Sequence, residues 1–167
     1  MRGRSPSPRA RSALSSTAIA VAVAVIVVDH ATKWWAQRAL DDRDIELIGS
    51  LRLHLVYNRG AAFGLGSRYA PFIALAALTI VLIVFRSAGG LHGRLAQVAV
   101  GLVIGGAIGN LLDRLFRDGP GFLGGGVVDF IDVQFWPVWN VADMGVSIGA
   151  VVLALTAGRE REPEAVT

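Results

Sequence analysis

Residues 95–114 have the sequence LAQVAVGLVIGGAIGNLLDR, an apolar run that closes with the polar side chains of Asn110, Asp113 and Arg114. The run contains no charged residue from position 95 to position 112, close to the ~20 residues that a helix needs to cross a bilayer. Three glycines recur at intervals of four and share one helical stripe, which predicts close contact with another helix; they are Gly101, Gly105 and Gly109.

Three further apolar stretches lie at about 13–28, 70–85 and 141–157. Apolar residues make up 53% of the chain, and the mean hydropathy is +0.54. Charged residues make up 17%, against about 25% in soluble domains. The sequence therefore predicts an all-α membrane protein with four transmembrane helices in one domain over residues 13–157. A basic tail before an apolar run is also typical of a signal peptide, but no A-x-A-type cleavage site follows, so we expect a retained helix.

The charge pattern predicts an orientation. The four arginines of the first twelve residues have no acidic partner there, and neither do Arg86 and Arg94 between the second and third runs. By the positive-inside rule both termini are expected in the cytoplasm, in disordered tails over residues 1–12 and 158–167. The net charge of +3 is attributed to contact with anionic lipid headgroups, so no nucleic-acid partner is expected.

The segments 29–69 and 113–140 are then expected on the outer face. Leucines alternate with polar residues over 45–58, the period of a half-buried strand, which predicts a small β cradle at the membrane surface. Four tryptophans at the predicted helix ends fit an aromatic belt; they are Trp34, Trp35, Trp136 and Trp139.

Ionisable groups beside apolar runs are costly to bury and are candidates for function. Asp29 and Lys33 stand four residues apart, so they either form an ordinary helix ion pair or support a site. Asn58-x-Gly60 is typical of a turn, whose small residues would also let the backbone approach a ligand. Asn110 has an amide to satisfy inside an apolar run and is expected to bond a neighbouring helix.

Two aspartates flank the fourth run. Asp129 lies in Val-Val-Asp-Phe-Ile-Asp at 127–132, where apolar neighbours favour a partly buried carboxyl with a raised pKa. Asp143 follows Asn140 by three residues, which predicts a helix N-cap with a capping-box acid and leaves a site role open. Asp132 is expected in a less constrained position.

Two neighbouring carboxyls can share a proton and act as acid and base on one water. Other hydrolytic chemistries have less support. The chain contains no cysteine, which excludes a cysteine nucleophile and thiolate metal sites. Its three histidines accompany no serine motif and give little support to a serine triad or a three-histidine zinc site.

Together these motifs resemble the prolipoprotein signal peptidase family, signal peptidase II. The resemblance extends from about 29 to 149 and rests on five ordered motifs: Asp29-x-x-x-Lys33, 58–64, 105–114, 127–130 and Asn140-x-Ala142-Asp143. It implies a four-helix membrane aspartic endopeptidase with an extracytoplasmic β cradle, which cleaves prolipoproteins before the diacylglyceryl-modified cysteine. It also implies that globomycin occupies the site and that no metal or cofactor is needed.

The resemblance assigns the catalytic pair to Asp129 and Asp143. The residues that it implies for substrate binding or support are Asp29, Lys33, Asn58, Gly60, Asn110, Asp113, Arg114 and Asn140. The expected partners are prolipoprotein signal peptides and membrane lipid, and the expected state is a monomer in the bacterial cell membrane with its active site near the outer face. One departure from the family is the glycine-rich segment 115–126, which is longer than usual.

Two other hypotheses stay open. Asp129-x-x-Asp132 together with Asp143 could supply carboxylate ligands for a divalent metal in a membrane phosphotransferase, although further motifs expected of such enzymes are absent from the sequence. Intramembrane acids can also serve as proton relays in a transporter or other non-enzymatic membrane protein, but no internal repeat supports a transporter.

Overall fold

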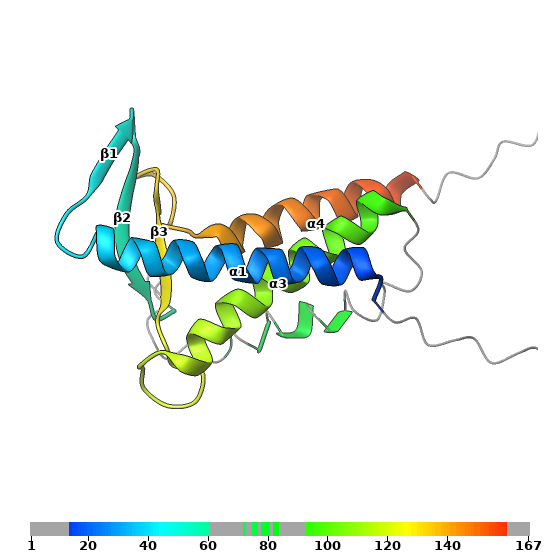
Figure 1. Ribbon diagram of the computed structural model, residues 1–167, viewed down its shortest axis with the longest axis horizontal. Helices are drawn as coiled ribbons and strands as arrows, with labels where there is room; N and C mark the ends of the chain where they lie inside the picture. The colour runs from blue at the N-terminus through cyan, green and yellow to red at the C-terminus, as the bar shows by residue number, and fades with distance from the viewer. Residues whose placement is uncertain are drawn as a thin grey trace, which may run out of the picture.

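The computed structural model describes residues 14–60, 72, 75–76, 78–80, 82–83 and 93–159. Its described elements are helices α1 (Ser16–Ala39), α3 (Arg94–Phe116) and α4 (Val141–Arg159) and strands β1 (Ile45–Ile48), β2 (Leu51–Asn58) and β3 (Val127–Asp132). The three helices run lengthwise together, and the small sheet lies at one end of them (Figure 1). The fold is therefore mostly helical with a three-stranded antiparallel sheet.

Helix α1 is longer than the apolar run that predicted it. It begins after Ser15, whose hydroxyl accepts the N–H of Ala18, the usual N-cap arrangement. The sequence predicted its end near Val28, but the helix continues to Ala39. Residues 29–39 contain neither glycine nor proline, so nothing interrupts the helix when its composition turns polar. The extension carries Asp29 and Lys33 inside the helix, and both side chains are buried.

Helix α3 packs against both other helices and is the centre of the helical part. A Cβ atom on Gly101 would lie 2.6 Å from the carbonyl oxygen of Ala18, and one on Gly105 would lie 2.7 Å from that of Ala22. These contacts confirm the predicted close approach along the glycine stripe. Gly106 points instead toward α4, where a Cβ atom would collide with the carbonyl oxygen of Ala142.

The sheet pairs β2, which precedes α3 in the sequence, with β3, which follows it. The sequence predicted a small β element over 45–58, and this segment forms the antiparallel β1–β2 hairpin. The third strand was not predicted: Val127–Asp132 pairs antiparallel with β2, with Val56 opposite Asp129. Val128 and Phe130 are buried against Ala36 of α1 and against Leu40, the residue that caps this helix, so the sheet is fixed to the end of that helix.

The segment between α3 and β3 folds back compactly. The N–H of Gly125 donates to the carbonyl oxygen of Arg114 at 3.1 Å. The three glycines at 124–126 are buried, and a Cβ atom on Gly125 would lie 2.5 Å from the carbonyl oxygen of Asp113. Glycine therefore allows this longer connection to pack tightly against the end of α3.

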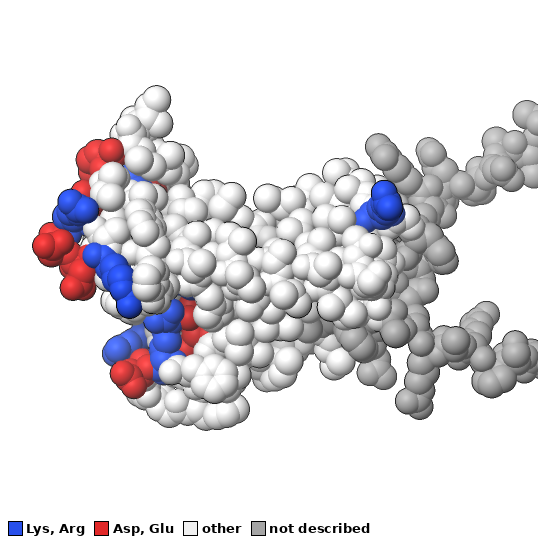
Figure 2. Space-filling model, viewed as in Figure 1, with Lys and Arg blue, Asp and Glu red and all other residues white. Residues whose placement is uncertain are grey.

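Helices α1 and α3 are long and apolar enough to cross a membrane, and α4 has a shorter apolar part over Val141–Thr156. The second expected span, 70–85, falls mostly outside the described residues, although its described positions are helical. The expected tail over 1–12, the part of the expected tail 158–167 beyond Arg159, and motif residues 61–64 also lie outside them. Gly158 and Arg159, expected in that tail, belong to helix α4. Charged side chains of the described part gather at the sheet end, while the helices present a nearly uncharged face (Figure 2).

Candidate active site

Asp129 lies at the middle of β3 with a side chain that is only 2% exposed. Its Oδ1 accepts from the Nδ2 of Asn140 at 2.6 Å, and its Oδ2 accepts from the Nδ2 of Asn58 at 3.0 Å. Burial, followed by the negative charge of Asp143, raises the pKa of Asp129 from 3.8 to about 7. The two amide donors and the charge of Lys33 oppose this rise. The apolar neighbours of Asp129 thus have the effect expected from the sequence.

Asp143 lies in the first turn of α4 and completes a capping box. The backbone N–H of Asn140 donates to Oδ2 of Asp143 at 3.2 Å, and the N–H of Asp143 donates to Oδ1 of Asn140 at 3.0 Å. The capping interpretation of the sequence is therefore confirmed. Oδ1 of Asp143 does not take part in the cap and accepts from Nδ2 of Asn110 at 2.7 Å.

Two asparagine amides join the two aspartates. Asn140 donates from Nδ2 to Asp129 and also to Oδ1 of Asn110 at 3.1 Å. Asn110 in turn donates to Asp143. The carboxyls of Asp129 and Asp143 thus belong to one hydrogen-bond network, although one comes from a strand and the other from a helix. Each of their four oxygen atoms accepts one donor.

Lys33 is a fully buried cation beneath this network. Its Nζ contacts Oδ2 of Asp29 at 2.7 Å, Oδ2 of Asp113 at 2.8 Å and Oδ1 of Asn110 at 2.9 Å. These three acceptors match the three donors of an ammonium group. Asp29 also accepts the backbone N–H of Ala142 at 2.9 Å through Oδ1. The pair at 29 and 33 is therefore an i, i+4 ion pair and, at the same time, a link from α1 to the start of α4.

Asn58 and Gly60 form the turn that the sequence predicted. The N–H of Gly60 donates to Oδ1 of Asn58 at 3.0 Å, and Gly60 has a φ of 90°, which glycine adopts without strain. This contact leaves Nδ2 of Asn58 directed at Asp129.

Arg114 is 7% exposed and is subject to the charges of Asp129, Asp143 and Asp113. Its Nη1 is buried and has no hydrogen-bond partner among the residues that the structure describes. Arg114 therefore adds positive charge close to the paired carboxyls.

Asp132 is more constrained than the sequence suggested. It is buried, accepts from Nε of Arg52 at 2.8 Å and accepts the N–H of Gln134 at 2.7 Å. Burial acts to raise its pKa, but the Gln134 N–H and the Arg52 guanidinium outweigh it and hold the pKa below its usual value. Residues 129 and 132 are an odd number of positions apart in β3, so their side chains leave opposite faces of the strand. Together they do not form the carboxylate ligand set that a metal would need.

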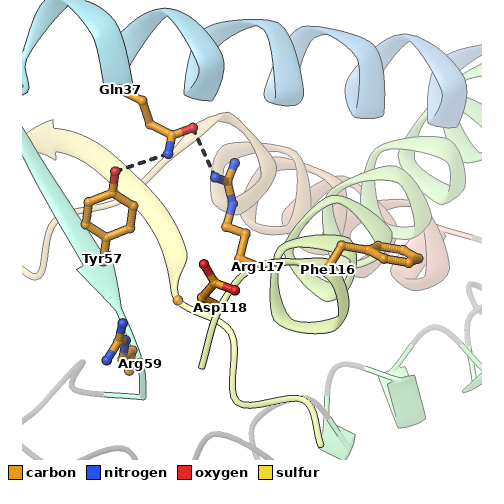
Figure 3. A pocket seen from close by; sticks show the side chains of 7 residues that line it. Gln37, Tyr57, Arg59, Phe116, Arg117 and Asp118 are labelled. Atoms are coloured by element: carbon orange, nitrogen blue, oxygen red, sulfur yellow. Dashed lines mark hydrogen bonds between the residues drawn. The ribbon is translucent and has the colours of Figure 1, made fainter. Parts of the chain in front are cut away.

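Sequence reasoning missed a group of three residues at the sheet end of α1 and α3 (Figure 1). Nε2 of Gln37 donates to the hydroxyl of Tyr57, and Nη1 of Arg117 donates to Oε1 of Gln37, at 3.1 and 3.0 Å (Figure 3). They line a cavity of about 370 Å³. The i, i+4 spacing of Asp113 and Arg117 was the available signal for their ion pair. No local spacing connects Gln37 with Tyr57 or Arg117.

Comparison with known proteins agrees with this architecture. Residues 21–158 match the family described as signal peptidase (SPase) II. A lipoprotein signal peptidase of Rhodococcus jostii is 42% identical over 73% of this chain and 62% of its own length. One of Streptomyces coelicolor is 38% identical over 72% of this chain and 59% of its own length. The chain thus spans about three fifths of the length of these curated relatives.

A solved structure described as a bacterial membrane enzyme superposes with a TM-score of 0.72 at 27% identity, covering 90% of this chain and 94% of that one. The apolar helices, the sheet at their end and these likenesses define a bacterial membrane protein with a buried polar site. The family match covers most of the chain, residues 21–158, and therefore decides to which family of membrane proteins it belongs. The chain belongs to the signal peptidase II family.

Proposed function

We propose that this protein is a membrane aspartic endopeptidase that removes signal peptides from prolipoproteins by cleaving before the diacylglyceryl-modified cysteine. The observation that carries the proposal is the shared amide network of Asp129 and Asp143. It supports the assignment of these two residues as the catalytic pair. The curated relatives are named lipoprotein signal peptidases, which supports the choice of substrate.

The proposed chemistry needs one protonated and one ionised carboxyl. A pKa of about 7 for Asp129 allows this residue to hold a proton near neutral pH while a second carboxylate stays charged. The ionised partner takes a proton from water, whose oxygen bonds to the scissile carbonyl carbon. The protonated partner hydrogen-bonds the developing oxyanion, and a proton then passes to the leaving amine as the C–N bond breaks. No metal or cofactor takes part.

The polar residues around the pair have supporting roles in this proposal. Asn58, Asn110 and Asn140 orient the two carboxyls through the hydrogen bonds described above. Lys33, held by Asp29 and Asp113, offsets negative charge beneath them. Arg114 is the group whose buried Nη1 can donate to a substrate carbonyl, because no described residue uses it.

The proposed membrane arrangement has four spans within residues 13–157, with the segments before and after them in the cytoplasm. The site then lies near the outer face, beside the sheet. The concentration of charge at the sheet end supports the placement of that end at a membrane surface (Figure 2), as does the exposure of Trp34, Trp35 and Trp136, because amphipathic rings favour the membrane interface. The proposed partners are membrane lipid and the lipidated prolipoprotein, and the proposed active state is a monomer.

Purified protein in detergent, given a peptide with a diacylglyceryl cysteine, is expected to cleave immediately before that residue. A matched peptide with an unmodified cysteine is the substrate control. Asp129→Asn and Asp143→Asn are each expected to lower kcat by at least about a thousandfold, since the two groups act as a unit, while Asp132→Asn retains cleavage.

Three results would refute parts of the proposal. Near-normal turnover by either catalytic variant would refute the dyad assignment. Loss of wild-type activity with a chelator would favour the metal-dependent alternative. Absence of cleavage by the wild-type protein would favour a non-enzymatic role.

A further inference from the structure

Arg117 directly follows Phe116, the last residue of α3, and caps that helix. Its contacts connect α3 with α1 and, through Gln37, with β2. Its backbone N–H closes the helix on the carbonyl of Asp113, and its Nε donates to Oδ1 of the same residue. Its Nη1 donates to Gln37 of α1, which donates on to Tyr57 of β2 (Figure 3). The guanidinium is thus held by two directed contacts, which its planar fork suits better than a point charge would.

Asp113 is the junction through which Arg117 reaches the candidate active site. While Oδ1 faces Arg117, Oδ2 contacts Nζ of Lys33 at 2.8 Å and accepts the backbone N–H of Val128 at 3.3 Å. A carboxylate rotates about one bond, so fixing one oxygen atom also fixes the direction of the other. Arg117 therefore holds Oδ2 where both α1 and β3 meet it.

Asp129 follows the first residue that this junction binds, and Asp143 lies three contacts beyond it, through Lys33 and Asn110. Val128 immediately precedes Asp129, so its N–H bond to Asp113 fixes the strand at that point. Lys33 donates to Oδ1 of Asn110, which determines that the amide nitrogen of Asn110 faces Asp143. One carboxylate thus determines the position of one member of the pair and the hydrogen bonding of the other.

We propose that Arg117 is a positioning residue for the catalytic pair, acting through Asp113; this rests on the proposed function. The residue lies in the longer glycine-rich segment, outside the motifs that carried the family resemblance. The alternative is a helix-end ion pair that contributes to stability alone. A positioning role predicts loss of turnover with little change in substrate binding, because displaced catalytic groups raise the barrier of the chemical step.

The test measures kcat, KM and the thermal midpoint of the full chain in detergent on the diacylglyceryl-cysteine peptide. Arg117→Gln is expected to lower kcat by about ten- to a hundredfold, with KM within about twofold of wild type. Arg117→Lys is expected to recover part of the lost kcat, since an ammonium can still pair with Asp113 but does not reproduce both directed contacts of the guanidinium.

Arg59→Gln is the matched control. It removes an arginine that lines the same cavity and that has no ion pair with any described residue, and its kcat is expected to be unchanged.

The activity of the wild-type protein distinguishes the two proposals. An inactive wild type refutes the proposed function, whereas the role of Arg117 is tested only by comparing variants with an active wild type. Given an active wild type, a kcat of Arg117→Gln within twofold of it overturns the positioning role. A fall of kcat in Arg117→Lys equal to that in Arg117→Gln, together with a lower thermal midpoint in both, also overturns it. If Arg117→Gln does not fold, Gln37→Leu decides, with Tyr57→Phe as its control. Gln37→Leu removes the second contact of Arg117 together with the hydrogen bond to Tyr57, whereas Tyr57→Phe removes only the latter. A lower kcat in Gln37→Leu than in Tyr57→Phe supports the proposal, and equal kcat in the two refutes it.

Discussion

Asn140 and Asp143 donate to each other: the N–H of Asn140 reaches Oδ2 of Asp143 at 3.2 Å, and the N–H of Asp143 reaches Oδ1 of Asn140 at 3.0 Å. The same Asn140 side chain donates from Nδ2 to Asp129 at 2.6 Å. One residue thus starts α4 and connects the two aspartates. The helix-cap and active-site interpretations of the sequence are compatible, because they use different atoms of the asparagine.

These two uses of Asn140 can be separated by substitution. Asn140→Ser is expected to retain most of the stability, because serine also serves as an N-cap, while Asn140→Ala should cost about 0.5–2 kcal/mol. Both variants lack the Nδ2 donor to Asp129, so both should lower kcat by at least about tenfold. Thermal midpoints and turnover of the lipidated peptide check this pattern. Full activity in Asn140→Ser would show that the donor to Asp129 is dispensable.

The raised pKa of Asp129 predicts a definite pH dependence of stability. The folded protein holds the proton up to a pKa of about 7, whereas the unfolded chain releases it near 3.8, so folded protein binds more protons between these values. Stability contributed by this group is therefore present at low pH and is lost as the pH rises from about 4 to 7. Three pKa units set an upper limit of about 4 kcal/mol on this loss.

Thermal midpoints measured in detergent at pH 5, 6, 7 and 8 check the prediction. The wild type is expected to lose stability across this series, and Asp129→Asn is expected to lose less. Asp132→Asn is the control, because the pKa of Asp132 lies below its usual value and its titration falls outside the range. Parallel curves for the wild type and Asp129→Asn would contradict the assignment.

Much of this architecture follows from periodicity. Apolar runs predicted α3 and α4 closely, and leucine alternation predicted strand structure in the segment that forms the β1–β2 hairpin. Strand β3 was missed because Val-Val-Asp-Phe-Ile is a short apolar run without an alternating pattern, which periodicity alone cannot assign to a strand or a buried helix. The end of α1 was missed because the apolar run stops at Val28, whereas the helix continues through residues 29–39, whose composition is more polar.

The sequence predicted which residues form the candidate site, but it predicted only some of the contacts between them. Asn140 and Asp143 stand three residues apart, so their hydrogen bonds are local and follow from spacing. The contacts of Lys33 with Asn110 and Asp113 span about eighty residues and depend on how α1 packs on α3. No sequence pattern specifies which acceptors meet there. The same reason explains why Asp132 was expected in a less constrained position, since its pairing with Arg52 also joins distant residues.

Lys33 is the only lysine of the chain, and it is fully buried between two carboxylates. Lys33→Met is expected to destabilise the protein by about 3–5 kcal/mol, because Asp29 and Asp113 would stay buried without their shared cation. Arg38→Met on the exposed side of the same helix is the control and should change stability by less than about 0.5 kcal/mol. Unfolding in detergent measures both. Equal effects of the two variants would show that the Lys33 ion pairs contribute no more than a surface charge.

The contact of Gly106 with α4 predicts a link between helix packing and activity. A Cβ atom there would collide with the carbonyl oxygen of Ala142 and lie 2.9 Å from Cγ2 of Val146. Backbone cannot rotate away as a flexible side chain can, so Gly106→Ala should push the first turn of α4, and Asp143 with it, away from α3. The substitution is expected to lower the free energy of unfolding by about 1–3 kcal/mol and to lower kcat.

Gly145→Ala is the control, because the nearest contact of its Cβ atom, the carbonyl oxygen of Leu102, would be at 3.2 Å. It is expected to have a smaller effect on both the thermal midpoint and the turnover. If Gly106→Ala matches Gly145→Ala in thermal midpoint and turnover, the position of Asp143 does not depend on this close approach of α3 and α4.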